Sequence, residues 1–105
     1  MGEYEDIHQY NRENTTNYTT KLLSFVRYSE NEKLIIVSNF DDEKIGEFQL
    51  EISSEIIKKW NLKDGTYQLK DKLYNSKTFN LEVVNSHGTI SIIINPLESY
   101  ILQLQ

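Results

Sequence analysis

The chain has 105 residues, a formal net charge of −5 and an isoelectric point near 5.0. This length fits one domain, and 38% hydrophobic residues supply enough apolar surface for a core that is stable without disulfide bonds or a structural metal ion. The eleven basic residues are scattered, which argues against nucleic acid or an anionic membrane as a partner, and the absence of cysteine excludes disulfides and thiolate metal sites.

Residues 1–20 differ from the rest of the chain. They are polar, rich in Asn, Thr, Glu and Tyr, and show little periodicity, so we expect a linker that leads into a domain spanning residues 21–105. They contain no apolar h-region of a signal peptide, and no apolar run in the chain approaches the ~18 residues of a membrane span. The compartment is therefore left unassigned.

Short β-like runs alternate with turn signals from Lys21 onward. The runs predict seven strands, over Lys21–Tyr28, Lys33–Phe40, Ile45–Ile52, Thr66–Leu73, Phe79–Val84, Thr89–Ile94 and Ser99–Gln105. An eighth strand is expected if part of the N-terminal segment pairs. The connections are too short for parallel crossovers, so the strands should be antiparallel.

Two interruptions of the β pattern have local explanations. A serine ahead of the apolar pair Ile56 and Ile57, with lysines following, predicts one short helix over Ser53–Trp60. Asn85–Gly88 is expected to form a four-residue hairpin loop, in which Gly88 is able to take a positive φ.

These elements predict an all-β fold. An antiparallel two-sheet β-sandwich of seven to eight strands with one short helix is the first choice, because strands recur at the 8–12-residue spacing of sandwiches and barrels. A small closed barrel of the oligonucleotide-binding type is the alternative.

Reactive groups are sparse in the sequence. His8 lies in the polar N-terminal segment and His87 in a predicted hairpin loop, and neither has a ligand at a recognised metal spacing. Asp41–Lys44 is interpreted as a charged turn, because it lacks the alternating oxygens and central glycine of a calcium loop. We therefore predict no catalytic residue, metal site or cofactor in this chain.

Exposed aromatic rings could still hold a sugar. Trp60 and Tyr74 sit near predicted turns and are the candidate carbohydrate-binding residues. Trp60 also closes the predicted helix beside Leu62, and the competing interpretation makes it a packing residue. Tyr67 and Tyr100 are in phase with inward positions and are expected in the core.

Two strand motifs stand out in the sequence. Val37-Ser38-Asn39-Phe40 ends a hydrophobic strand with the pattern V-x-N-F, and a G-x-Y-x-L-x-D-x-L strand begins at Gly65. Together with Gly2–Asn11, Leu23–Arg27 and Ile94–Leu102, and in this order along the chain, these segments resemble the C-terminal β-sandwich domain of α-amylase-family (glycoside hydrolase family 13-like) enzymes.

This resemblance implies an eight-stranded Greek-key sandwich packed against a catalytic (β/α)₈ barrel that precedes residue 1. It implies that the parent enzyme acts on α-glucans, and that this domain stabilises the barrel or helps to hold substrate. The family's catalytic acids belong to the barrel, so none is carried over to this chain. An autonomous carbohydrate-binding module is the alternative function, and an independent small enzyme is a third hypothesis.

Overall fold

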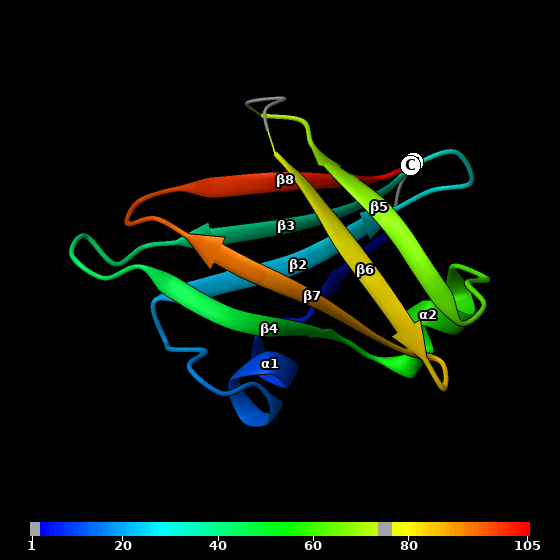
Figure 1. Cartoon of the computed structure of the whole chain (residues 1–105), viewed down its shortest axis with the longest axis horizontal. Coiled ribbons are helices and arrows are strands. Elements are labelled where there is room, and N and C mark those ends of the chain that lie inside the picture. Colours follow the sequence, from blue (N-terminus) through cyan, green and yellow to red (C-terminus); the bar gives the residue numbers. More distant parts are fainter. Residues whose placement is uncertain (1–2, 74–76) are drawn as a thin grey trace.

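The computed structural model describes residues 3–73 and 77–105 (Figure 1). The two helices of this part are α1 (His8–Asn14) and α2 (Ser54–Lys59). The strands are β1 (Glu3–Asp6), β2 (Leu22–Tyr28), β3 (Lys33–Asn39), β4 (Gly46–Ile52), β5 (Gly65–Asp71), β6 (Thr78–Val84), β7 (His87–Ile94) and β8 (Ser99–Leu104). The seven expected strands are confirmed to within a few residues at each end.

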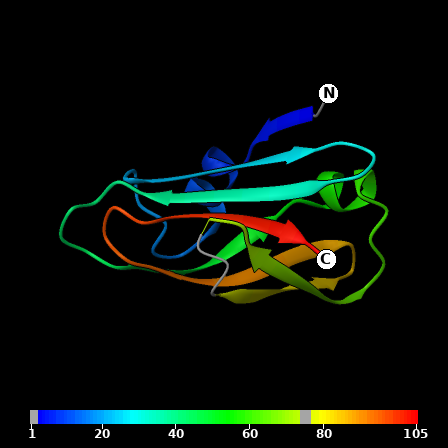
Figure 2. The same cartoon turned by 90° about the horizontal axis from the view of Figure 1, so that it is seen from above.

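All strand pairings are antiparallel, and they join the eight strands into one sheet of order β1-β2-β3-β8-β5-β6-β7-β4. The sheet curls, so that the β1-β2-β3-β8 half faces the β5-β6-β7-β4 half across the core (Figure 2). Leu69–Asp71 of β5 pairs with Leu102–Leu104 of β8 and connects the two halves. The predicted antiparallel all-β class is confirmed, in the form of one continuous curled sheet.

Period-two polarity places the core side chains as predicted. In β4, Phe48, Leu50 and Ile52 are buried whereas Glu47 and Gln49 are exposed. Each fully buried Leu or Ile contributes about 1.5–3 kcal/mol relative to an exposed one. The core continues from one half of the sheet to the other, which is why the sheet curls around it.

The N-terminal segment, expected to be a linker, contributes two elements to this fold. Glu3–Asp6 pairs with β2, which confirms the possible eighth strand. Helix α1 was not expected, so the structure has two helices where one was predicted. A seven-residue helix is unstable alone, and here it is held by its packing on β2 and β4 and by the burial of Ile7 just before it.

The second helix forms where the sequence predicted it. Ser53 has the extended backbone of an N-cap residue, Glu55 lies in the first turn and lysines lie in the last, which suits the helix dipole. Ile56 and Ile57 are buried against the sheet.

The hairpin between β6 and β7 differs from the expectation. Asn85 and Ser86 both have positive φ (52° and 62°), which makes a two-residue turn of type I′, and Gly88 lies inside β7. The expected four-residue loop was wrong, and Gly88 does not use the positive φ that is open to glycine. A Cβ on Gly88 would lie 3.0 Å from Ile57 Cδ1, so the glycine is needed for close packing of α2 on β7.

A single buried amide joins α1 to the edge of the sheet. The Asn11 side chain is fully buried, and its Nδ2 donates to the carbonyl oxygens of Ile7 (3.0 Å) and Glu51 (3.0 Å). Its Oδ1 accepts from the Glu51 N–H (2.6 Å) and the Thr15 hydroxyl (2.6 Å). These four bonds use both N–H donors and both acceptor lone pairs of the amide. The two bonds to Glu51 are of the kind that a neighbouring strand would make with its backbone.

Replacing this amide tests its importance for the fold. Asn11→Ala should lower the free energy of unfolding by about 2–4 kcal/mol, because it leaves the Glu51 N–H and C=O without partners. The measurement is urea denaturation. Asn14→Ala is the matched control on the same helix: its amide is exposed and donates only to the Tyr10 carbonyl, so the loss should be about 0.5 kcal/mol. Equal losses in the two variants would contradict the role given to Asn11.

A buried phenol makes the fold sensitive to alkaline pH. The Tyr18 hydroxyl hydrogen-bonds to Ser24 Oγ (2.7 Å) and its ring packs edge-on against Phe48. Burial raises the pKa of Tyr18 to about 12. The unfolded pKa is about 10, so the stability due to the neutral phenol is complete below pH 10 and is lost as pH rises from 10 to 12.

Tyr18→Phe should therefore lose about 1 kcal/mol at neutral pH through the missing hydrogen bond, yet lose less than the parent chain on going to about pH 11. The measurement is the free energy of unfolding across this pH range. An unchanged alkaline slope in the variant would show that Tyr18 does not cause it.

Candidate functional site

The histidines each contact one carboxylate. His8 begins α1, and its backbone N–H and ring lie against Asp6. His87 is the first residue of β7 and not a loop residue, and its Nε2 is hydrogen-bonded to Glu51. A hydrolytic triad also needs a nucleophile within hydrogen-bond reach of the imidazole. Across residues 3–73 and 77–105, neither ring is hydrogen-bonded to a hydroxyl group.

Tyr100 lies at the centre of a cluster of titratable side chains. Lys77 Nζ donates to its hydroxyl (2.7 Å), and the hydroxyl contacts the Glu98 carboxylate (2.7 Å) and the Ile93 carbonyl (3.2 Å). Burial raises the pKa of Tyr100, and the hydrogen bond to Tyr100 raises the pKa of Lys77. A general base needs the opposite shift, so this cluster is suited to fixing the β7–β8 loop and not to proton transfer.

The acidic turn after β3 uses its oxygens internally. The Asp41 carboxylate accepts hydrogen bonds from the N–H groups of Glu43 (2.9 Å) and Lys44 (3.0 Å), which lower the pKa of Asp41. In the part of the chain that the structure covers, no group of three or more His, Cys, Asp or Glu side chains is placed to hold a metal ion.

The two candidate sugar-binding residues are not brought together as a platform. Trp60 is only 3% exposed and packs edge-on against Tyr28, with 5.9 Å between ring centroids, so its faces are not open for stacking. Tyr74 lies outside the described residues. The expected burial of Tyr100 is confirmed, and Tyr67 is half-buried against the core.

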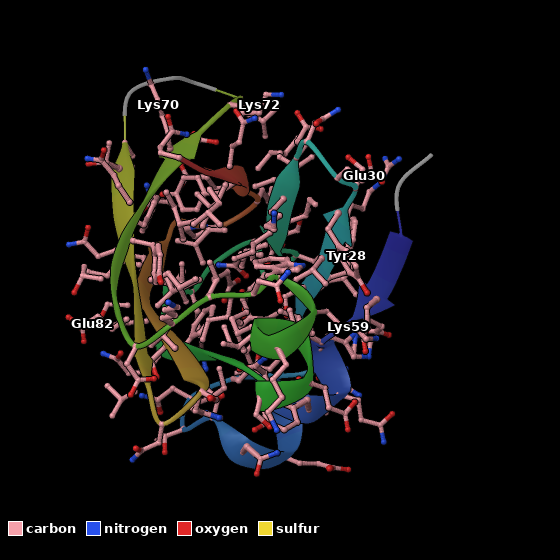
Figure 3. The ribbon with its side chains drawn as sticks, turned by 90° about the vertical axis from the view of Figure 1, so that its right-hand side faces the viewer. Tyr28, Glu30, Lys59, Lys70, Lys72 and Glu82 are labelled. Atoms are coloured by element: carbon pink, nitrogen blue, oxygen red, sulfur yellow. The ribbon has the colours of Figure 1, made fainter. Side chains whose placement is uncertain are left out.

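A polar hollow lies beside Trp60. Tyr28, Glu30 and Lys59 surround it at the junction of β2 and α2 (Figure 3). Glu5, whose Oε2 lies 3.5 Å from Lys59 Nζ, together with the Tyr28 hydroxyl raises the pKa of Lys59. The hollow presents one half-buried tyrosine ring, whereas sugar recognition by stacking uses open ring faces.

Three large apolar side chains are exposed at one end of the molecule. Phe40, Ile45 and Leu97 are 60%, 59% and 68% exposed. Phe40 and Ile45 flank the acidic turn between β3 and β4, and Leu97 lies in the β7–β8 loop; both loops project from the same end (Figures 1 and 2). We call these three residues the apolar end.

Buried hydrogen bonds hold the apolar end in shape. Asn39 is 3% exposed, and its Nδ2 donates to the carbonyls of Lys44 (3.0 Å), Ile94 (3.3 Å) and Asn95 (3.3 Å). The Leu97 N–H then donates to the Asp41 carbonyl (3.1 Å), which joins the two loops directly. The apolar side chains are therefore presented on a fixed backbone.

Leu97 adopts a backbone conformation that leucine disfavours. Its φ is 59°, in the left-handed region, where a side chain bearing Cβ costs about 1–2 kcal/mol. Strained residues of this kind persist where the side chain serves a function. Leu97 is two-thirds exposed and adds little to the core, so packing within this chain does not account for a leucine at this position.

Leu97→Gly should therefore leave the isolated chain as stable as before or more stable, by up to about 1 kcal/mol, because glycine accepts this φ. The matched control is Val84→Gly, which removes an equally exposed apolar side chain from a regular strand and should cost about 1 kcal/mol. Urea denaturation of both variants is the measurement. A loss at Leu97 as large as the loss at Val84 would contradict the strain argument.

No protein-family model, curated protein or solved structure matches this chain. Among the described residues, no helix combines the length and apolar character needed to cross a membrane.

Proposed function

We propose that this chain is a non-catalytic accessory domain that docks onto a partner domain through the apolar end. We further propose that the partner is the catalytic barrel of an α-amylase-like glycoside hydrolase acting on α-glucans, which the domain stabilises. The observation that carries the first part is that the apolar end (Phe40, Ile45 and Leu97) is exposed and lies on a hydrogen-bonded backbone.

The state of the reactive groups supports a docking role. The polar clusters at Asn11, Asn39 and Tyr100 have their hydrogen bonds satisfied within the fold, and each connects separate elements. A catalytic site would instead aim unsatisfied donors, acceptors or shifted acids at a shared cleft. Nothing in the geometry of Trp60 favours the carbohydrate-binding alternative.

The placement of the apolar end limits how a barrel can reach it. Residue 3 lies toward the opposite end of a molecule whose longest dimension is 38 Å (Figure 2). A (β/α)₈ barrel of about 250 residues has a radius of gyration of about 18 Å and thus a diameter of about 46 Å. A barrel joined at the N-terminal end is large enough to extend along the domain to the apolar end.

The second part of the proposal is supported by the resemblance of the sequence segments. The family's two-sheet Greek-key sandwich is a finer description that we propose for the same eight antiparallel strands. The short β5–β8 pairing would then be the corner at which the two sheets touch, and the passage from β4 to β5 would be the Greek-key crossover.

Two measurements on the chain alone test its class. An assay on soluble starch should show no turnover, and reproducible hydrolysis would overturn the non-catalytic assignment. An NMR titration with maltoheptaose should show no saturable shifts at millimolar sugar. Saturable shifts would instead identify a carbohydrate-binding module.

Docking is tested with a barrel of an α-amylase-family enzyme that lacks its own C-terminal domain. Adding the chain should raise the melting temperature of this barrel, and the variant Phe40→Ser/Ile45→Ser/Leu97→Ser should lose the effect. Val84→Ser is the matched control, because Val84 is equally exposed on another surface, and it should keep the effect. If adding the chain leaves the melting temperature of the barrel unchanged, the glycoside hydrolase assignment is overturned.

A further inference from the structure

Strand β4 is an edge of the sheet, and part of this edge is free. β4 pairs only with β7, and its outward side meets α1 where Asn11 binds both backbone groups of Glu51. Backbone groups of alternate residues point to the same side of a strand. The N–H and C=O groups of Glu47 and Gln49 therefore point outward as those of Glu51 do, and within the described part of the chain they have no hydrogen-bond partner.

A groove of about 800 Å³ borders this part of β4. It is lined by residues 14–17, which follow α1, by Glu47–Gln49 and Glu51 of β4, and by Ser91–Ile93 of β7, so it extends from the edge over the outer face of β4 and β7. An added strand needs only a spacing of about 4.8 Å from β4. The outward backbone groups of Glu47 and Gln49 supply the partners that strand addition requires, and the groove leaves space next to them.

The charge beside the groove selects the occupant. Glu47 and Gln49 are exposed on the outward face, and the whole chain carries a net charge of −5. In an antiparallel pair, opposite charges on facing residues are stabilising and like charges are destabilising. A strand added here therefore fits best with a Lys or Arg opposite Glu47.

A second copy of the chain fits less well. Two β4 edges related by a two-fold axis at Phe48 would pair Glu47 of each copy with Gln49 of the other. The two Glu47 side chains would then be diagonal neighbours about 7–8 Å apart, between two chains that are each net negative. The same electrostatics that favour a basic peptide oppose this dimer.

We propose that the free edge of β4 at Glu47 and Gln49 binds an extended basic peptide segment by antiparallel strand addition, with a Lys or Arg opposite Glu47. The groups at Gln49 and Glu47 supply up to four main-chain hydrogen bonds, two from each residue. Asn11 ends the site on one side, because it already occupies Glu51. This surface is separate from the apolar end, and the proposal does not depend on the docking function.

The test uses the peptide acetyl-Gln-Thr-Lys-Thr-amide and the full chain, followed by NMR. In antiparallel pairing its Gln faces Gln49 and its Lys faces Glu47, so that no peptide residue faces the capped Glu51. Saturable shifts at the amides of Glu47 and Gln49 are expected. The same peptide with N-methyl groups on the Gln and the Lys loses two donors and should bind about tenfold or more weakly. A peptide with Glu in place of the Lys should also bind weakly.

Variants of the chain locate the site. Gln49→Pro removes an outward N–H and spares the ladder to β7, so it should abolish binding. Glu47→Lys should weaken binding, whereas Glu82→Lys, the same charge change at an exposed position of β6, should not. If Gln49→Pro does not fold, the N-methylated peptide tests the same main-chain hydrogen bonding with the unaltered chain.

Three results would overturn the proposal. One is the absence of saturable binding to the chain. Another is equal binding of the methylated and unmethylated peptides. The third is self-association of the chain through β4, seen as Gln49→Pro converting a dimer to a monomer in sedimentation, which would make a second copy the occupant.

Discussion

The side-chain amide of Asn11 is the interaction on which the geometry of this molecule most depends. Through this amide, α1 both donates a hydrogen bond to the edge strand β4 and accepts one from it. A neighbouring β-strand would make the same pair of bonds. The bond spans forty residues of sequence and draws the N-terminal segment over the opening of the curled sheet. It also divides the edge of β4 into a capped part at Glu51 and a free part at Glu47 and Gln49.

A second theme is that two polar networks in this fold connect separate elements. Asn39 joins the β3–β4 turn to the β7–β8 loop, and Tyr100 joins Lys77 to Glu98. Satisfied polar networks of this kind add rigidity and fix a unique arrangement. The surfaces between them, an apolar end and a free strand edge, are therefore held in a fixed shape, which both proposed contacts require.

The sequence predicted the parts of the fold that depend on local patterns. Period-two runs located the seven strands from Leu22 onward, and a serine with an apolar pair located α2. Helix α1 was not predicted, because it is short, has no side-chain cap and depends on packing for its stability. The joining of all eight strands into one sheet was also not predicted. It depends on the short pairing of β5 with β8, and no local sequence pattern specifies such a contact.

The surfaces were harder to predict than the strands. Phe40 and Ile45 were read as strand ends, although an apolar residue on each side of an acidic turn is a signal that could have marked them as exposed. The strain at Leu97 depends on its φ and has no sequence signature apart from the preceding proline. Trp60 drew attention as a rare residue near a turn, and only the packing of α2 shows that it is buried.

Amide hydrogen exchange of the full chain, read residue by residue, tests the central role of Asn11 most directly. Outward-facing amides of an edge strand exchange rapidly unless something binds them. The Glu51 amide should exchange as slowly as that of Leu50, which points toward β7, whereas the amides of Glu47 and Gln49 should exchange far faster. Rapid exchange at Glu51, equal to that at Gln49, would show that Asn11 does not cap the sheet.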